Sequence, residues 1–176
     1  LERLADPNYV VLPRYWVPEE EVEARLRARW DRGWLLGWRD IARATDERTV
    51  IAAVIPRVGV GHKFLLMLPK LAQSVSMLLA LMDSIPFDFC ARQKLGGTDL
   101  TYSIMKQLPV LPPEVFDRPC PWSPGEILAD WIRPRVLELT YTAWDLEPFA
   151  RDLGYEGPPF RYDPERRFQL RCELDA

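Results

Sequence analysis

The sequence is poor in the residues that build metal centres and disulfide frameworks. It contains three cysteines, Cys90, Cys120 and Cys172, and a single histidine, His62, among 176 residues. The cysteines are odd in number and widely spaced, so we expect unpaired, buried thiols and a reducing, cytoplasmic setting. A zinc site would have to recruit carboxylates from distant positions, so the sequence predicts no metal site.

Long hydrophobic runs are also missing. A membrane-spanning helix needs roughly 20 consecutive apolar residues. The longest candidate, Leu71 to Met82, is shorter and contains the polar residues Gln73, Ser74 and Ser76. The first residues, LERLAD, lack the apolar core of a signal peptide and do not begin with methionine, which favours a piece of a longer protein. We therefore expect no membrane partner.

Neither sign of charge dominates, because 23 Lys/Arg and 26 Asp/Glu give a formal net charge of −3. A domain that binds nucleic acid is usually far more basic. The charge is uneven, however: residues 34–112 contain 9 Lys/Arg and 6 Asp/Glu, whereas residues 113–176 contain 8 and 13. The central part of the chain is therefore the part best suited to a polyanion.

The hydrophobic pattern predicts an α/β (α+β) fold, with a mixed β-sheet and packed helices. Residues 1–33 should form an extended segment followed by a helix from Pro18 to Gly33. Residues 34–113 should form the α/β core, and residues 114–176 a helical C-terminal part. The length suits one well-packed domain built from all three parts.

Three apolar segments of the core are predicted to be strands, at residues 34–38, 49–55 and 62–68. The short loop 57–61 favours a hairpin, so the last two strands should pair. A helix over 71–84 should pack on the sheet. The other expected elements are a helix over 86–92, a strand or turn over 100–111, a helix over 123–141 that Pro134 kinks or interrupts, and helices over 145–153 and 164–174.

The most informative stretch is Gln93-Lys94-Leu95-Gly96-Gly97-Thr98, which continues through Met105 to Pro113. Basic residues flank its Gly-Gly break, where the backbone can take positive φ and approach a ligand. The pattern closely resembles the target-recognition domains of DNA restriction–modification proteins. Such domains occur in type I specificity subunits and in the C-terminal part of single-chain adenine-N6 methyltransferases. Further matching segments keep the same order, and they are Pro13–Val17, Trp38–Ile41, Thr45–Ile51, Asp83–Ser84, Phe87–Phe89, Glu165–Arg167 and Glu173–Ala176.

This resemblance implies a sequence-specific recognition domain for double-stranded DNA, with the fold of a target-recognition domain. It also implies a partner, a methyltransferase catalytic domain in the same longer chain, which would carry the cofactor S-adenosylmethionine. This chain has no cofactor motif, and Asp6-Pro7-Asn8-Tyr9 lacks the second proline of the Asn/Asp-Pro-Pro-aromatic motif that holds a flipped adenine. The chain is therefore expected to be non-catalytic by itself.

Reading a DNA duplex requires side chains that donate or accept hydrogen bonds in the grooves, and basic or hydroxyl groups that contact phosphates. The candidates surround the first strands and the Gly-Gly break, and they are Arg39, Arg43, Arg48, Arg57, His62, Lys63, Arg92, Gln93, Lys94, Gly96, Gly97, Thr98, Tyr102 and Lys106. Five basic residues among them should share one exposed face with the Gly-Gly turn, namely Arg57, Lys63, Arg92, Lys94 and Lys106.

Each candidate also has a structural alternative. Neighbouring residues can form ion pairs, as in Arg39/Asp40, Glu47/Arg48 and Asp88/Arg92. Six tryptophans lie in apolar stretches of sequence and are expected in the core, and they are Trp16, Trp30, Trp38, Trp122, Trp131 and Trp144. For the whole chain, the alternative is a protein-interaction or structural module whose acidic C-terminal part packs on a partner. A free-standing enzyme is disfavoured, because the single histidine and the scattered cysteines offer no nucleophile–base spacing. The spacing of Asp83, Asp88 and Asp99 also matches no ligand pattern of a metal-dependent nuclease.

Overall fold

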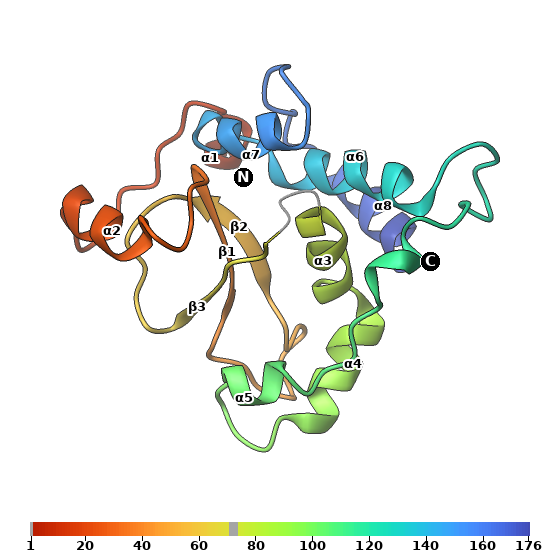
Figure 1. The fold of residues 1–176 in the computed structure, drawn as a ribbon, viewed down its shortest axis with the longest axis horizontal. Coiled ribbons are helices and arrows are strands. Elements are labelled where there is room, and N and C mark those ends of the chain that lie inside the picture. The colour runs from red at the N-terminus through yellow and green to blue at the C-terminus, as the bar shows by residue number, and fades with distance from the viewer. Residues whose placement is uncertain (1, 71–73) are drawn as a thin grey trace.

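The computed structural model describes residues 2–70 and 74–176, and it contains a three-stranded β-sheet surrounded by helices (Figure 1). The strands are β1 (Trp34–Arg39), β2 (Ala52–Pro56) and β3 (Phe64–Met67). This combination confirms the predicted α/β (α+β) class. The sheet is antiparallel throughout, however, where a mixed sheet was expected.

The strand order β2-β1-β3 places β1 at the centre, so β2 and β3 do not pair and the predicted hairpin is wrong. Leu36 of β1 lies opposite Val54 on one side and Met67 on the other. Every β1 residue except Arg39 is buried, and such a continuous apolar run is most fully covered in the middle of a sheet. Gly37 also permits the arrangement, because an added Cβ would lie 2.5 Å from the Leu65 carbonyl oxygen.

Two consecutive helices follow the sheet, α3 (Val75–Met82) and α4 (Ile85–Lys94). The helix expected over 71–84 therefore exists, although its first residues, 71–73, lie outside the described residues. It packs against β2 and against α6 (Leu128–Thr140). The Ser84 side chain accepts a hydrogen bond from the Phe87 backbone N–H at 3.3 Å, which begins α4 as a capped helix.

Some of the remaining helices were expected with other limits, whereas the helices at residues 2–5 and 102–105 were not expected. The remaining helices are α1 (Glu2–Ala5), α2 (Glu19–Leu26), α5 (Tyr102–Met105), α7 (Glu147–Asp152) and α8 (Pro164–Asp175), with 3₁₀ turns η2 (Pro113–Val115) and η3 (Trp144–Leu146). α2 ends at Leu26, before the expected Gly33, and beyond it the Trp30 indole N–H donates to the Trp34 carbonyl. α5 replaces a predicted strand or turn. The sequence predicted that Pro134 kinks or interrupts the helix that contains it. α6 instead continues through Pro134, which is exposed.

One hydrophobic cluster joins residues from all parts of the chain, including Leu26, Leu36, Leu79 and Phe149. Of the tryptophans expected in the core, Trp30, Trp38 and Trp131 are buried, whereas Trp16, Trp122 and Trp144 are exposed. The exposed ones lie outside regular helices and strands, in an extended segment, a loop and a 3₁₀ turn respectively.

The three thiols differ in exposure. Cys120 is buried as expected, Cys90 is partly exposed, and Cys172 is exposed on α8, where the expectation of burial was wrong. None of the described helices has the length and apolar character to span a bilayer.

Candidate nucleic-acid interface

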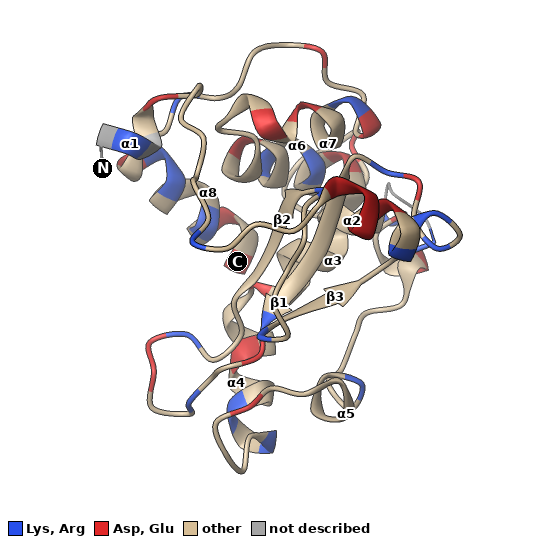
Figure 2. Cartoon of the chain, turned by 90° about the vertical axis from the view of Figure 1, so that its left-hand side faces the viewer, with Lys and Arg blue, Asp and Glu red and all other residues tan. Residues whose placement is uncertain are grey.

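Three segments remote in sequence meet beyond the end of β1, at residues 39–48, 61–63 and 92–106. The Asp40 N–H donates to the Lys63 carbonyl and the Ala42 N–H to the Thr98 carbonyl, each at 2.9 Å. A guanidinium N–H of Arg92 donates to the Ala44 carbonyl, also at 2.9 Å. Figures 1 and 2 both place α4, α5 and the loop after β1 at the lower end of the molecule. We call these three segments the basic end.

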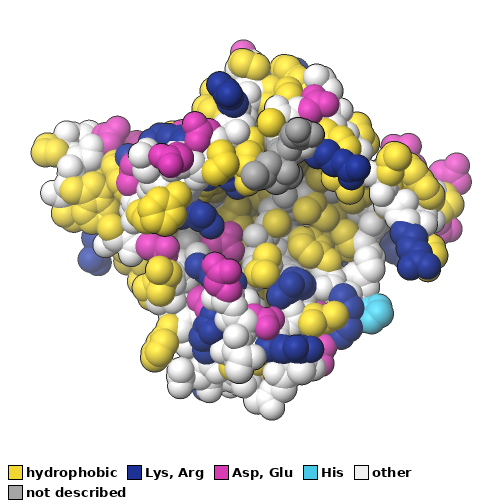
Figure 3. Space-filling view, turned by 180° about the vertical axis from the view of Figure 1, so that it is seen from behind, with side chains coloured by type: hydrophobic (Ala, Val, Ile, Leu, Met, Phe, Trp, Pro, Cys, Tyr) yellow, Lys and Arg dark blue, Asp and Glu magenta, His cyan; other side chains and the backbone are white. Residues whose placement is uncertain are grey.

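The basic end differs in charge from the rest of the chain. It contains seven Lys/Arg and four Asp/Glu, a balance of +3, whereas the whole chain carries −3. The cations are Arg39, Arg43, Arg48, Lys63, Arg92, Lys94 and Lys106, and the acids are Asp40, Asp46, Glu47 and Asp99. In the space-filling view from behind, several Lys and Arg side chains lie in the lower half of the face, below an apolar hollow, with Asp and Glu side chains among them (Figure 3). All the sequence-predicted site residues except Arg57 lie in these segments.

Arg57 lies at the opposite end of the sheet, where its backbone N–H donates to the Gly33 carbonyl at 3.1 Å. Its guanidinium makes a double contact with Glu23 of α2, at 2.6 and 3.0 Å, and its side chain is only 16% exposed. It also donates to the carbonyls of Trp30 and Arg32. The predicted common face is therefore wrong for Arg57, which ties α2 to the sheet.

Lys63 is held between two carboxylates. Its Nζ lies 2.8 Å from Asp40 Oδ2 and 2.6 Å from Asp99 Oδ1, and the Thr98 hydroxyl donates to Asp99 at 3.3 Å. The hydrogen bonds to Asp40 and Asp99 raise the pKa of Lys63, and the hydrogen bond from Lys63 lowers the pKa of Asp99. The Lys63 ammonium is thus occupied by two carboxylates within hydrogen-bond distance. Such a group does not suit a phosphate contact.

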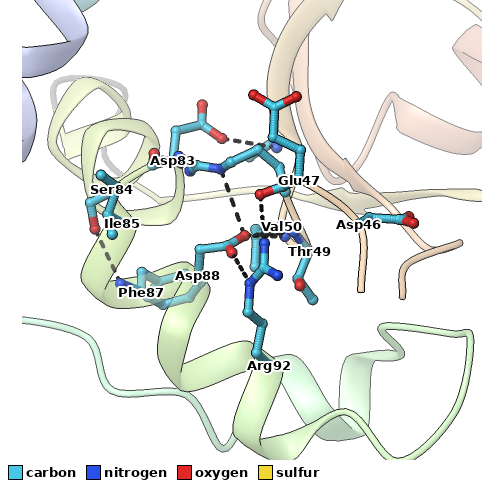
Figure 4. Close-up of polar contacts among 12 residues, drawn as sticks. Asp46, Glu47, Thr49, Val50, Asp83, Ser84, Ile85, Phe87, Asp88 and Arg92 are labelled. Carbon is cyan, nitrogen blue, oxygen red and sulfur yellow. Dashed lines mark hydrogen bonds and ion pairs between the residues drawn. The ribbon is translucent and has the colours of Figure 1, made fainter. Parts of the chain in front are cut away.

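Asp88 organises a second group, at the base of the loop after β1 (Figure 4). The Asp88 side chain is 6% exposed, and its Oδ1 accepts hydrogen bonds from the backbone N–H groups of Thr49 and Val50 at 2.7 and 2.8 Å. Its Oδ2 accepts from Arg92 Nε at 2.7 Å, and Arg48 Nε lies 3.7 Å from Oδ1. Burial by itself would raise the pKa of Asp88, but the hydrogen bonds from Val50, Arg92 and Thr49 outweigh it and lower the pKa.

Asp83, at the C-terminal end of α3, has a related role. Its Oδ1 accepts from the Ala52 N–H at 3.1 Å, so Asp83 and Asp88 together satisfy outward-facing N–H groups at the β2 edge of the sheet. Burial raises the pKa of Asp83 to about 6, although the Ala52 hydrogen bond opposes this shift. Arg48 donates to the Asp83 carbonyl and is therefore used inside the protein. The three aspartates do not form one cluster, because Asp99 belongs to Lys63.

Two further candidates are also engaged internally. Arg92, besides contacting Asp88, donates to the Ala44 and Glu47 carbonyls at 2.9 and 2.5 Å. Arg39 Nη2 lies 3.7 Å from Asp46 Oδ2, so Arg39 pairs with Asp46 rather than with its neighbour Asp40. Lys63 is exposed, as the predicted face requires, whereas Arg92 is only partly exposed, and both side chains are ion-paired within the protein. The alternative that Asp88 pairs with Arg92 is confirmed.

The residues available for a ligand form a smaller set. Five of the sequence-predicted candidates have exposed side chains with no hydrogen-bond or ion-pair partner in the described part of the chain, and they are Arg43, His62, Gln93, Lys94 and Lys106. Tyr102 is 44% exposed, and its hydroxyl donates to the Leu66 carbonyl at 2.9 Å. Its ring lies edge-on to Trp38.

Gly96 and Gly97 are exposed and have open space around them, but neither takes a positive φ. The expected conformational reason for these glycines is therefore wrong. What the glycines leave is an uncrowded backbone between α4 and Asp99.

Sequence reasoning missed the partners of the cations, because most are distant along the chain. Pairing of β1 with β3 is what brings Asp40 and Lys63 close enough to form their ion pair. Arg92 contacts carbonyls of the loop after β1, far away along the chain. The i,i+4 spacing of Asp88 and Arg92 was the only local signal. Within residues 2–70 and 74–176, no group of three or more His, Cys, Asp or Glu is placed to hold a metal ion. Comparisons with protein-family models, curated proteins and solved structures found no match to this chain.

Proposed function

We propose that this chain is a sequence-specific recognition domain for double-stranded DNA, non-catalytic by itself. It would act beside an adenine-N6 methyltransferase catalytic domain in the same longer chain, and that domain would bind S-adenosylmethionine. The observation that carries the proposal is the basic end, which gathers a balance of +3 in a chain of net charge −3. The resemblance of residues 93–113 to target-recognition domains supports the same function.

The exposed, unpartnered side chains have the chemistry that this role needs. Arg43 can donate two hydrogen bonds to a guanine edge, and Gln93 can pair with an adenine edge. Lys94 and Lys106 carry point charges suited to phosphates. Arg92 holds backbone carbonyls of the basic end, and Lys63 joins the Asp40 and Asp99 carboxylates, so these paired cations contribute less to the electric field outside the protein. DNA affinity should therefore depend on the free cations rather than on all seven.

The first experiment measures duplex DNA binding by fluorescence anisotropy over a range of salt concentrations. Each phosphate contact contributes about −0.9 to the slope of log K against log [salt]. Lys94→Ala and Lys106→Ala should each weaken binding and flatten the slope by about one contact. Arg171→Ala is the matched control, because Arg171 is an exposed cation on α8, outside the basic end. If the wild-type protein does not bind duplex DNA even at low salt, the proposal is contradicted.

Specificity needs its own measurement, because phosphate contacts alone bind every sequence. Selection from a pool of randomised duplexes should enrich a defined motif, and single changes within it should each cost about 1–3 kcal/mol. Enrichment of no motif, despite salt-dependent binding, would reduce the proposal to non-specific DNA binding.

A second candidate function is a protein-interaction module, and one observation favours it. The extended segment between α1 and α2 exposes six large apolar side chains, which are Val10, Val11, Leu12, Tyr15, Trp16 and Val17. Figure 1 shows this segment away from the basic end, so the two surfaces can serve different partners. A pure interaction module would show no salt-dependent duplex binding, and alanine changes at Lys94 and Lys106 would have no effect.

A further inference from the structure

The loop of residues 41–47, which follows β1, is fixed at both ends. At its start, the Ala42 N–H donates to the Thr98 carbonyl at 2.9 Å, and Ile41 bridges to Asp99. Just beyond its end, the N–H groups of Thr49 and Val50 donate to Asp88 at 2.7 and 2.8 Å. The loop therefore leaves and re-enters the fold through hydrogen bonds to the segments around it.

Arg92 fixes the middle of the same loop. Its Nε donates to Asp88, and its two terminal nitrogens donate to the Ala44 and Glu47 carbonyls. A guanidinium presents these donors in one rigid plane, so a single residue sets the spacing of both carbonyls. Figure 4 shows Arg92 with its contacts to Asp88 and Glu47. The Arg43 carbonyl accepts from the Thr49 hydroxyl at 3.3 Å and from the Asp46 N–H at 3.2 Å. Three carbonyls of this short loop are thus engaged within the protein.

The engaged backbone leaves exposed side chains. Arg43, Ala44, Thr45 and Glu47 are exposed, and Arg43 has no partner among the described residues. A loop that is ordered before binding loses less conformational entropy when it meets a ligand. An arginine and a threonine on such a loop can donate to base edges in the major groove.

We infer that the 41–47 loop is the element that reads bases, with Arg43 and Thr45 as its contacts, and that Arg92 and Asp88 position it without touching DNA. This inference rests on the proposed DNA recognition. It also changes the role of Arg92 from ligand contact to positioning residue. The buried Asp88 fixes one loop conformation, a use for which buried ion pairs are better suited than for adding net stability.

The positioning role is tested without DNA by amide hydrogen exchange of the full chain. Arg92→Lys keeps the charge beside Asp88 but cannot hold both carbonyls, because an ammonium lacks the planar fork. The amides of Asp46, Thr49 and Val50 should then exchange about tenfold faster, as expected when a hydrogen bond is weakened, while those of β1 stay unchanged. Arg133→Lys, which alters the Arg133–Asp130 pair on α6, is the control and should leave the loop unaffected.

The DNA measurement separates positioning from contact. If Arg92 touched a phosphate, Lys would substitute for it and affinity would be kept, as it should be in the control Lys94→Arg. We expect instead that Arg92→Lys loses affinity and relaxes preference at the base pair that Arg43→Ala also relaxes. Arg43→Ala should lower affinity for the preferred duplex by about 5- to 150-fold.

Three outcomes overturn the inference in distinguishable ways. Unchanged loop exchange or unchanged affinity in Arg92→Lys removes the positioning role. Unchanged base preference in both Arg43→Ala and Thr45→Ala, with wild-type protein binding duplex normally, removes the reading role but leaves the proposed function intact. Wild-type protein without salt-dependent duplex binding removes the proposed function, and this inference with it.

Discussion

Replacing Asp83 by asparagine should stabilise the protein at neutral pH. Burial raises the pKa of this carboxyl from an ordinary value of 3.8 to about 6. Each pKa unit corresponds to about 1.4 kcal/mol, so the ionised form costs the native state about 3 kcal/mol above pH 6. The hydrogen bond from the Ala52 N–H holds the carboxylate there, and an asparagine side-chain oxygen can accept it. The asparagine bond is weaker because it is not charge-assisted, so the expected net gain is about 1–2 kcal/mol.

The sign of the pH dependence follows from the two pKa values. The folded state holds the Asp83 proton more tightly than the unfolded state, so this contribution favours folding at low pH. It is fully present below about pH 4 and is lost as the pH rises through about 6. The difference in unfolding free energy between Asp83→Asn and wild type should therefore grow between pH 4 and pH 7.5.

Urea denaturation followed by tryptophan fluorescence, at several pH values from 4 to 7.5, measures this difference. Asp117→Asn is the matched control, because Asp117 is exposed and has no hydrogen-bond or ion-pair partner among the described residues. Its unfolding free energy should track wild type within about 0.5 kcal/mol. An Asp83→Asn variant that is less stable at pH 7.5, or that differs from wild type equally at all pH values, refutes the reasoning.

Three other predictions probe the fold. Asp88→Ala leaves Arg92 and two buried backbone N–H groups without their partner. It should lower the free energy of unfolding, measured by urea denaturation, by about 3–5 kcal/mol. Gly37→Ala places a Cβ 2.5 Å from the Leu65 carbonyl oxygen and should cost about 1–3 kcal/mol or more, whereas Gly97→Ala, in open space, should change little; equal effects would contradict the strand order. Cys172 should react with Ellman's reagent in the native protein and Cys120 only after unfolding, and mass spectrometry of the labelled peptides checks this order.

Features that depend on neighbouring residues were predictable from the sequence. The α8 helix begins at Pro164 because Asp163 accepts hydrogen bonds from the first turn, and both residues are adjacent in sequence. α4 begins after Ser84 for the same kind of reason. The Asp88–Arg92 pair follows from i,i+4 spacing on one helix. These contacts form within one or two helical turns and need little from the rest of the fold.

The strand order and the partners of the cations were decided only by tertiary structure. A hairpin between β2 and β3 satisfies the same local pattern, but burial of all of β1 except Arg39 places β1 between them. That choice brings Lys63 beside Asp40 and sends Arg57 to Glu23 at the other end of the sheet. Whether a basic residue is free or paired depends on which acid the fold places within a few ångströms. Sequence alone therefore located the basic region, while the fold selected which of its side chains face solvent.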